Sequence, residues 1–122
     1  GLSLYDFGDA IRFGGNTTYE DDENLDNVKI SIELFESFAR GFLSACAKAL
    51  TKTEVDCLAF SAKLMTFECG VRFLTDYLNG DVYFGIKYPE HNLVRCRTQI
   101  RLASEMEANF EKMGKIVAEA CK

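Results

Sequence analysis

Apolar side chains recur at three- and four-residue steps along three long stretches of the chain, and this spacing predicts three amphipathic helices. The first begins after Ser31, a predicted N-cap, and continues to about Leu50. Within it, Glu36 and Arg40 lie one turn apart and are expected to pair. The apolar positions that define this helix are Ile32, Phe35, Phe38, Ala39, Phe42, Cys46 and Ala49.

A second helix is predicted to begin at Thr51, because Thr51 and Glu54 have the spacing of a capping box. It should end near Leu78, since Asn79-Gly80 tolerates the positive φ that terminates helices. Two apolar rows follow it, which predicts that water reaches little of this helix and that it is the central one. The rows are Phe60, Leu64, Phe67, Val71, Leu74 and Leu78, and Leu58, Ala62, Met65, Cys69 and Phe73.

The third long helix is predicted from about Glu90 to the end of the chain, with an interruption at Gly114. Before it, residues 81–88 alternate in polarity and could be extended, but they are too few to found a sheet. Residues 1–30 are rich in glycine, asparagine and aspartate, and we expect mostly loop with one short helix from Asp9 to Phe13.

These patterns predict an all-α fold, with three long helices after an irregular N-terminal segment. The 122 residues, 48% of them hydrophobic, contain enough apolar side chain for one core, and the single proline, Pro89, lies in no linker-like stretch. We therefore expect one helical domain over residues 1–122. The start on Gly1 without a methionine suggests a trimmed tag or a fragment excised from a longer protein.

The charge pattern argues against nucleic acid and membrane partners. The net charge is −5, and the basic residues are scattered among acidic ones, so phosphate binding has no electrostatic footprint. No apolar run approaches the roughly 20 residues that cross a bilayer, and the first residues lack the basic start and apolar stretch of a signal peptide. We expect a soluble, cytoplasmic protein.

The five cysteines are predicted to be buried thiols, because they are widely spaced and fall within helical apolar patterns. A zinc site would need closely spaced pairs of ligands, and His91 is the only histidine. The same histidine is the only candidate base for a hydrolase, which would also need a nucleophile motif that the chain lacks. The cysteines are Cys46, Cys57, Cys69, Cys96 and Cys121.

Two short motifs resemble cation sites but lack the surroundings that such sites need. Asp6-Phe7-Gly8 has the lettering of the protein-kinase magnesium motif without the other kinase motifs. A second set of residues approaches the spacing of a calcium loop, although no amphipathic helix precedes it, and a solvated acidic linker is the favoured interpretation. That set is Asp22, Asn24, Asp26 and Glu33.

Three charged residues, Glu68, Arg72 and Asp76, step by four along the otherwise apolar second helix. An unpaired charge is costly to bury, so one interpretation is an intrahelical series of ion pairs. The alternative is that Arg72 points into a cleft, where its planar donors bind the hydroxyls or carbonyl of a polar substrate.

Three segments together resemble the C-terminal region of N-acetylhexosamine 1-kinases, members of the aminoglycoside phosphotransferase and choline kinase superfamily. The second segment is long and unusual, and the likeness covers nearly the whole chain. The segments are LYDFGDAIRFG at residues 4–14, AKLMTFECGVRFLTDYLNGDVYF at residues 62–84 and HNLVRCRTQ at residues 91–99.

The resemblance implies a bilobal kinase that transfers the γ-phosphoryl group of ATP, with Mg²⁺, to the anomeric hydroxyl of an N-acetylated sugar. This chain would be the helical part of its C-terminal lobe, and the catalytic and metal-binding aspartates would lie upstream of Gly1. Asp6 would match a structural aspartate behind the catalytic loop. The fragment alone should bind no cofactor and show no kinase activity, because phosphoryl transfer needs the phosphate and metal sites.

The resemblance also places Phe13, Arg72 and Tyr83 at substrate-contacting positions, as an aromatic platform, a bidentate donor and a ring that carries a hydroxyl group. Glu68 and Asp76 would then support Arg72 by fixing its rotamer. The expected partners are an N-acetylated hexosamine and the rest of the kinase, and the fragment could form a homodimer. The alternative function is a free-standing helical interaction or dimerisation module that associates through an apolar face.

Overall fold

Six α-helices and two 3₁₀ turns make up the regular structure of residues 4–15 and 19–121, the parts of the chain that the computed structural model describes. These residues form no β-strand, so the all-α prediction is confirmed and residues 81–88 are a loop without a strand. The helices are α1 Leu4–Gly14, α2 Ile32–Cys46, α3 Lys52–Asp56, α4 Leu58–Leu78, α5 His91–Ala108 and α6 Phe110–Ala120, with 3₁₀ turns η1 Leu25–Asn27 and η2 Ala47–Ala49.

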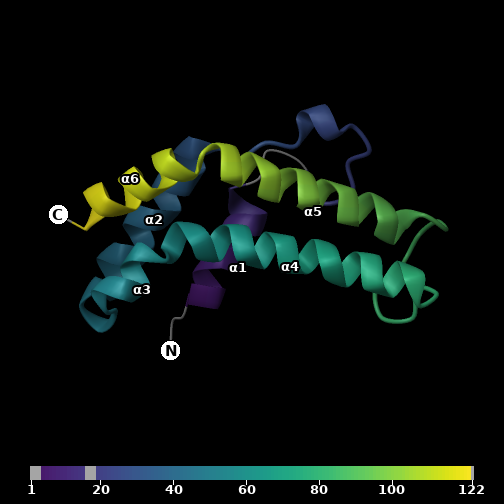
Figure 1. Ribbon diagram of the computed structural model, residues 1–122, viewed down its shortest axis with the longest axis horizontal. Coiled ribbons are helices and arrows are strands. Elements are labelled where there is room, and N and C mark those ends of the chain that lie inside the picture. The colour runs from purple at the N-terminus through teal and green to yellow at the C-terminus, as the bar shows by residue number, and fades with distance from the viewer. Residues whose placement is uncertain (1–3, 16–18, 122) are drawn as a thin grey trace.

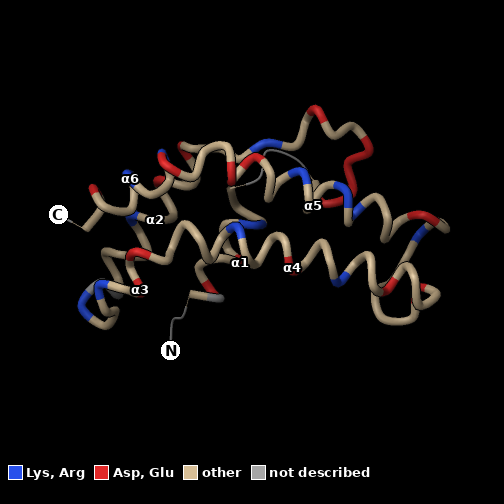
Figure 2. Tube along the Cα trace, viewed as in Figure 1, with Lys and Arg blue, Asp and Glu red and all other residues tan. Residues whose placement is uncertain are grey.

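The two longest helices, α4 and α5, lie side by side and run in opposite directions (Figure 1). Helix α1 crosses α4, while α2 and α3 lie at the end of the molecule where α6 and the C-terminus are found. The loop between α4 and α5 forms the opposite end. Acidic and basic residues are interspersed over the helices, and an acidic stretch lies within the loop between α1 and α2 (Figure 2).

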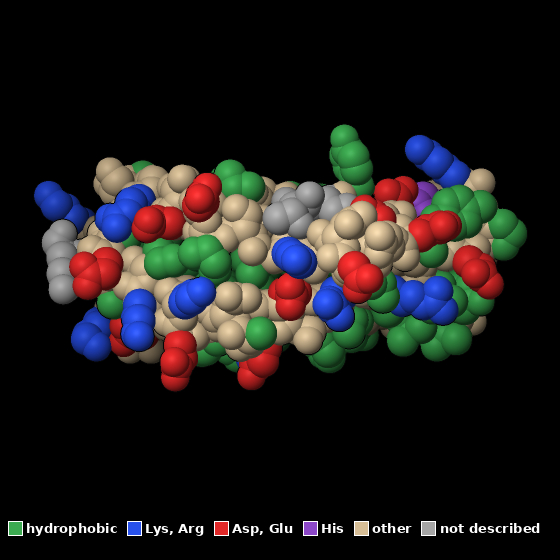
Figure 3. Space-filling view, turned by 90° about the horizontal axis from the view of Figure 1, so that it is seen from above, with side chains coloured by type: hydrophobic (Ala, Val, Ile, Leu, Met, Phe, Trp, Pro, Cys, Tyr) green, Lys and Arg blue, Asp and Glu red, His purple; other side chains and the backbone are tan. Residues whose placement is uncertain are grey.

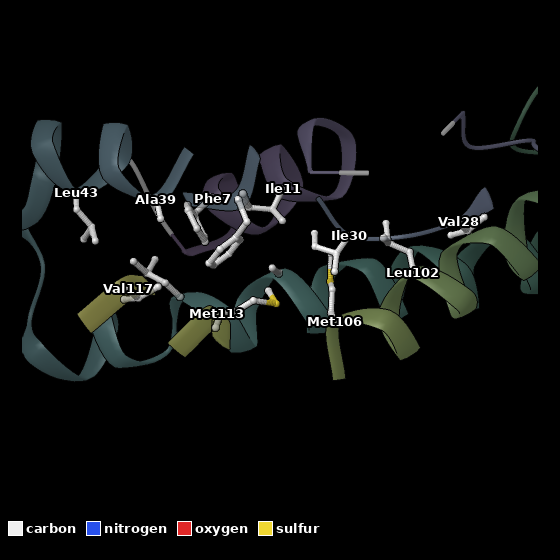
Figure 4. Packing of buried hydrophobic residues seen from close by; sticks show 14 residues of the cluster. Phe7, Ile11, Val28, Ile30, Ala39, Leu43, Leu102, Met106, Met113 and Val117 are labelled. Atoms are coloured by element: carbon white, nitrogen blue, oxygen red, sulfur yellow. The ribbon is translucent and has the colours of Figure 1, made fainter. Parts of the chain in front are cut away.

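The hydrophobic core lies where α1 and α2 meet α4, α5 and α6. Phe7 packs edge-on against Phe35 at a ring-centroid distance of 6.0 Å and lies 5.1 Å from the ring of Phe42. Figure 4 shows Phe7 of α1 close to labelled residues of α2 and α6, Ala39 and Met113. Gly8 allows this packing, since a Cβ there would lie 2.6 Å from the carbonyl oxygen of Ser61 on α4.

Several local predictions are confirmed. Ser31 Oγ accepts a hydrogen bond from the Leu34 amide at 3.2 Å, as an N-cap does. Thr51 and Glu54 form both bonds of the capping box, at 3.1 and 2.9 Å. The second long helix ends at Leu78, as predicted. The predicted pair of Glu36 and Arg40 forms, with Glu36 Oε2 3.7 Å from Arg40 Nη2.

Four helix boundaries differ from the sequence prediction. Helix α1 extends over Leu4–Gly14 instead of Asp9 to Phe13, because Phe7 and Ile11 give it a buried face. Helix α2 ends at Cys46, where the chain tightens into η2. Cys57 interrupts the second helix after its first turns. The last helix breaks at Asn109 and not at Gly114, because the Asn109 side chain and amide both bond to the Glu105 carbonyl.

The prediction that water reaches little of α4 is wrong. Helices α1 and α5 cover two of its sides and bury Ala62 and Phe73. One predicted row remains substantially exposed, because no described segment lies over it; Phe67, for example, is 51% exposed. We call these residues the α4 apolar row: Phe60, Leu64, Phe67, Val71, Leu74 and Leu78.

The cysteines are only partly as predicted. Cys96 is buried, Cys57 and Cys69 are half-buried, and Cys121 is exposed, so it is not a core thiol. These four are free thiols, and the Cys46 side chain lies outside what the structure describes. Within the described parts of the chain, no helix combines the length and apolar character needed to cross a membrane.

Candidate functional site

A pocket of about 340 Å³ opens between the C-terminal turns of α4 and the loop that follows. Its volume is within the range of small-molecule sites. It brings together Arg72 and Tyr83, two of the three residues predicted to contact substrate, and Asp76, a predicted supporting residue. The remaining lining residues are Thr75, Asn79, Val82 and Phe84.

The loop at residues 79–85, called the pocket loop below, turns sharply as α4 ends. Gly80 and Asp81 have positive φ angles of 97° and 61°. The Asp81 amide donates to the Asp76 carbonyl at 2.8 Å, which folds the chain back over the last turn of the helix. This reversal points the amides of residues 82–84 toward the side chain of Asp76.

Asp76 is a buried carboxylate, with only 5% of the residue exposed. Its Oδ1 accepts from the Tyr83 amide at 2.8 Å, and its Oδ2 accepts from the Phe84 amide at 3.0 Å. Burial disfavours the charged form, but the backbone hydrogen bonds outweigh it and lower the pKa of Asp76 below its usual value. Consecutive amides that converge on an anion in this way form an anion-binding nest, here filled by the chain's own carboxylate.

Asn92, buried on the first turn of α5, continues this network. Its Nδ2 donates to Asp76 Oδ2 at 2.8 Å and to Asp81 Oδ1 at 3.0 Å. Its Oδ1 accepts from Arg95 Nη1 at 3.0 Å, and Arg95 also donates to the Gly85 carbonyl at 2.9 Å. The polar side of α5 therefore holds the pocket loop at both of its ends.

Arg72 is exposed at the pocket and does not take part in the predicted series of ion pairs. Among the described residues, no ion pair joins it to Glu68 or Asp76. Both Asp76 oxygens face the pocket loop and Asn92, so among the described residues Asp76 forms no ion pair that would fix the rotamer of Arg72. The Arg72 guanidinium is left available to a ligand.

Tyr83 is 74% exposed, so its ring and hydroxyl are accessible at the mouth of the pocket. Its ring lies edge-on to Phe84 at 4.9 Å, and Phe84 packs on the buried Phe73 of α4 at 4.6 Å. The loop is thus anchored by an apolar contact as well as by Asp76. Figure 3 shows hydrophobic side chains gathered at this end of the molecule.

Phe13, the third predicted substrate contact, is 61% exposed and does not line the pocket. Its ring lies 3.9 Å below the guanidinium carbon of Arg12. Arg12 is held by Asp9, by Glu20 at 2.9 Å and by Gln99 of α5 at 3.4 Å.

Cys69 is a half-buried free thiol of α4. Burial raises the pKa of the Cys69 thiol, and the positive charges of Arg12 and Arg72 partly offset this effect.

Asp6, which the resemblance predicts to be a structural aspartate, lies away from the pocket. It borders a groove between α1 and α2 together with Phe7 and Phe38, and it makes interactions of its own there. Glu68 is exposed on α4. The structure thus brings Arg72, Tyr83 and Asp76 to one place, and leaves Phe13, Glu68 and Asp6 outside the pocket lining.

In the motif that resembles a calcium loop, side-chain oxygens bond to nearby backbone amides. Asp22 Oδ1 accepts from the Asn24 amide at 2.8 Å, and Asn24 Oδ1 accepts from the Asp26 amide at 3.1 Å, so these side chains stabilise the turn itself. No group of three or more histidine, cysteine, aspartate or glutamate residues is placed for a metal in residues 4–15 and 19–121.

His91 is buried and hydrogen-bonded, as a structural residue is, and it is not placed as a catalytic base. Its Nδ1 accepts from the Lys87 amide at 3.2 Å, and its Nε2 lies 3.0 Å from Asp21 Oδ2. The ring is buried and stacks on Tyr88 at 4.6 Å. Both ring nitrogens are engaged, so His91 fastens the chain before α5 to the loop between α1 and α2.

Sequence reasoning missed Asn92 and Arg95. They lie on a different helix from Asp76, and the only signal was an asparagine beside the buried start of α5.

No protein-family model matches the chain.

Proposed function

We propose that this chain is the substrate-binding helical part of an ATP-dependent sugar kinase that phosphorylates the anomeric hydroxyl of an N-acetylhexosamine. The supporting observation is that Arg72 and Tyr83, selected by resemblance to such kinases, line the same pocket. ATP and Mg²⁺ are assigned to a part of the parent enzyme outside this chain, and the enzyme is cytoplasmic.

The chemistry of the pocket suits a polar ligand with apolar faces. Arg72 offers a planar set of N–H donors to hydroxyl or carbonyl oxygens, and the Tyr83 hydroxyl can donate or accept. Val82 and Phe84 provide apolar surface beside them. An N-acetylated sugar carries ring hydroxyls and an amide carbonyl, which can bond to Arg72 and Tyr83. It also carries a methyl group, which can contact the apolar surface.

The test is ATP consumption by the protein extended upstream of Gly1, called the extended protein below. N-acetylglucosamine and N-acetylgalactosamine are supplied as acceptors, and the 122-residue chain serves as the control. We expect sugar-dependent turnover by the extended protein and none by the chain alone, because these residues hold neither phosphate-binding loop nor metal ligands. Absence of turnover with either sugar, or ATP turnover by the chain alone, would contradict the proposal.

The second candidate function is an interaction module that forms a homodimer through the α4 apolar row. The row is symmetric about Cys69: Phe60 and Leu78 lie nine residues from it, Leu64 and Leu74 five, and Phe67 and Val71 two. Two copies of α4 that cross antiparallel at Cys69 would therefore place these residues opposite one another.

Charge supports the same pairing. Glu68 and Arg72 lie one turn apart on one flank of the row, and neither forms an ion pair within the described chain. An antiparallel two-fold axis brings Glu68 of each copy close to Arg72 of the other. Dimerisation would thus use the arginine that the first proposal assigns to the sugar.

Sedimentation of the 122-residue chain tests this second candidate. We expect a dimer that Phe67→Asp converts to a monomer, because a charge on the row would be buried in the interface. Tyr19→Asp is the matched control, since Tyr19 is exposed outside the row. A wild-type chain that stays monomeric at high concentration, or a dimer unaffected by Phe67→Asp, would exclude it.

A further inference from the structure

Asp76 lies where an isolated carboxylate is least favoured. It is in the last turn of α4, at the negative end of the helix macrodipole, and it is buried. A buried carboxylate must receive hydrogen bonds to offset its lost hydration. The amides of Tyr83 and Phe84 and the side chain of Asn92 supply them.

The path of the pocket loop depends on this carboxylate. Asp81 has a positive φ, which residues other than glycine seldom adopt. Its carboxylate accepts a hydrogen bond from Asn92. From Asp81 onward, the main chain runs past Asp76 with three successive amides directed inward. Inward-facing amides leave the Tyr83 side chain on the outside of the loop, where it is exposed at the pocket.

We infer that Asp76 is a positioning residue, which fixes Tyr83 at the pocket by binding the main chain of the pocket loop, with Asn92 as its buried partner. Its effect on a sugar rests on the proposed function, whereas its hold on the loop does not. The loop is therefore ordered before any ligand binds. Both carboxylate oxygens of Asp76 are already hydrogen-bonded, Oδ1 to the loop and Oδ2 to the loop and Asn92.

Asp76→Asn is the most informative variant because it keeps the size of the side chain. The amide nitrogen that replaces Oδ2 is a donor, and it would face the Phe84 amide and Asn92 Nδ2, which are donors too. Asn92→Ala is the second variant, since it removes a partner of Asp76 that does not line the pocket. Thr75→Val is the control, because among the described residues the Thr75 hydroxyl bonds within α4, to the Val71 carbonyl.

Amide hydrogen exchange on the 122-residue chain tests the hold on the loop. We expect slow exchange at the Tyr83 and Phe84 amides, accelerated at least about tenfold by Asp76→Asn and by Asn92→Ala and unchanged by Thr75→Val. The amides inside α4 should keep their protection in all variants, which distinguishes loop release from unfolding. Rapid exchange of both loop amides in the wild type, or protection retained in Asp76→Asn, would overturn the inference.

Sugar kinetics of the extended protein test whether the hold acts through Tyr83. We expect Asp76→Asn and Tyr83→Ala each to raise KM by about tenfold or more, and the double variant to be no worse than Tyr83→Ala alone. If the increases in KM of the two single variants multiply in the double variant, the positioning role is overturned, since Asp76 would then act independently of Tyr83. If the wild type uses no sugar, the proposed function fails, and the exchange measurement alone decides whether Asp76 holds the loop.

Discussion

Arg72 and Asp76 lie one turn apart on α4, yet they face different partners. The carboxylate is bonded to the pocket loop and Asn92, and the guanidinium is left facing the pocket. An intrahelical pair would have been the simplest outcome for this spacing. The pair does not form because three backbone amides of the pocket loop donate hydrogen bonds to the Asp76 carboxylate.

The candidate site was only partly predictable at this scale. The resemblance predicts Arg72 and Tyr83 as substrate contacts, whereas local spacing alone favours ion pairing for Arg72. Asn92 and Arg95 were not found, because their contacts depend on how α5 packs against the end of α4. Periodicity reports the face on which a residue lies, and it does not report the partner that this face meets.

The lowered pKa of Asp76 predicts a pH dependence of stability. Its hydrogen bonds stabilise the ionised form, so this contribution is present above the pKa of about 3.9 for an unfolded aspartate and is lost as pH falls through the lower folded pKa. We expect the difference in urea midpoint between the wild type and Asp76→Asn to be largest near neutral pH and to shrink below about pH 3.9. A difference that stays constant down to pH 2 would contradict this assignment.

At the scale of elements, the two helix starts with a capping side chain were predicted better than helix lengths. Ser31 and Thr51 act through side-chain bonds within three residues, which sequence spacing reveals directly. Helix α1 was underestimated because its glycines and aspartates suggest loop. Gly8 is in fact helical, and it lets α1 lie close to α4.

The close crossing of α1 and α4 predicts opposite effects of two glycine substitutions. In Gly8→Ala the new methyl group would meet the Ser61 carbonyl at 2.6 Å, and we expect a loss of about 1–3 kcal/mol in unfolding free energy. Gly41→Ala in α2 is the matched control, because nothing lies within 4 Å of its Cβ. It should gain about 0.5–1 kcal/mol from helix propensity.

Urea unfolding of both variants measures these changes. If Gly8→Ala were as stable as Gly41→Ala, the crossing of α1 over α4 would not be as close as described. A loss in both variants would indicate that the helical backbone at residue 41 is not free to accept a side chain.

At the scale of the whole molecule, the distribution of apolar surface differs most from the prediction. The sequence shows two apolar rows on the second long helix, and it does not show which of them the remaining helices cover. Helices α1 and α5 take the sides that include Ala62 and Phe73, and the α4 apolar row stays exposed. Under the first proposal this row would be covered by further parts of a larger kinase lobe, and under the second by a second copy of the chain.

The two proposed functions therefore make opposite demands on Arg72, which either binds a sugar or pairs with Glu68 of a second copy. In the extended protein, the first proposal predicts that the α4 apolar row is covered by the added residues and that Arg72 remains at the pocket. The second predicts association whether or not an upstream segment is present.

The most direct test of the sugar site is the KM for N-acetylhexosamine of the extended protein with Arg72→Ala. Arg101→Ala is the control, since Arg101 is exposed on α5 and does not line the pocket. We predict that Arg72→Ala raises KM about 10- to 100-fold with little change in kcat, as expected when a hydrogen bond from a charged donor to the substrate is lost. An unchanged KM, or an equal rise in Arg101→Ala, would contradict the assignment of this pocket to the sugar.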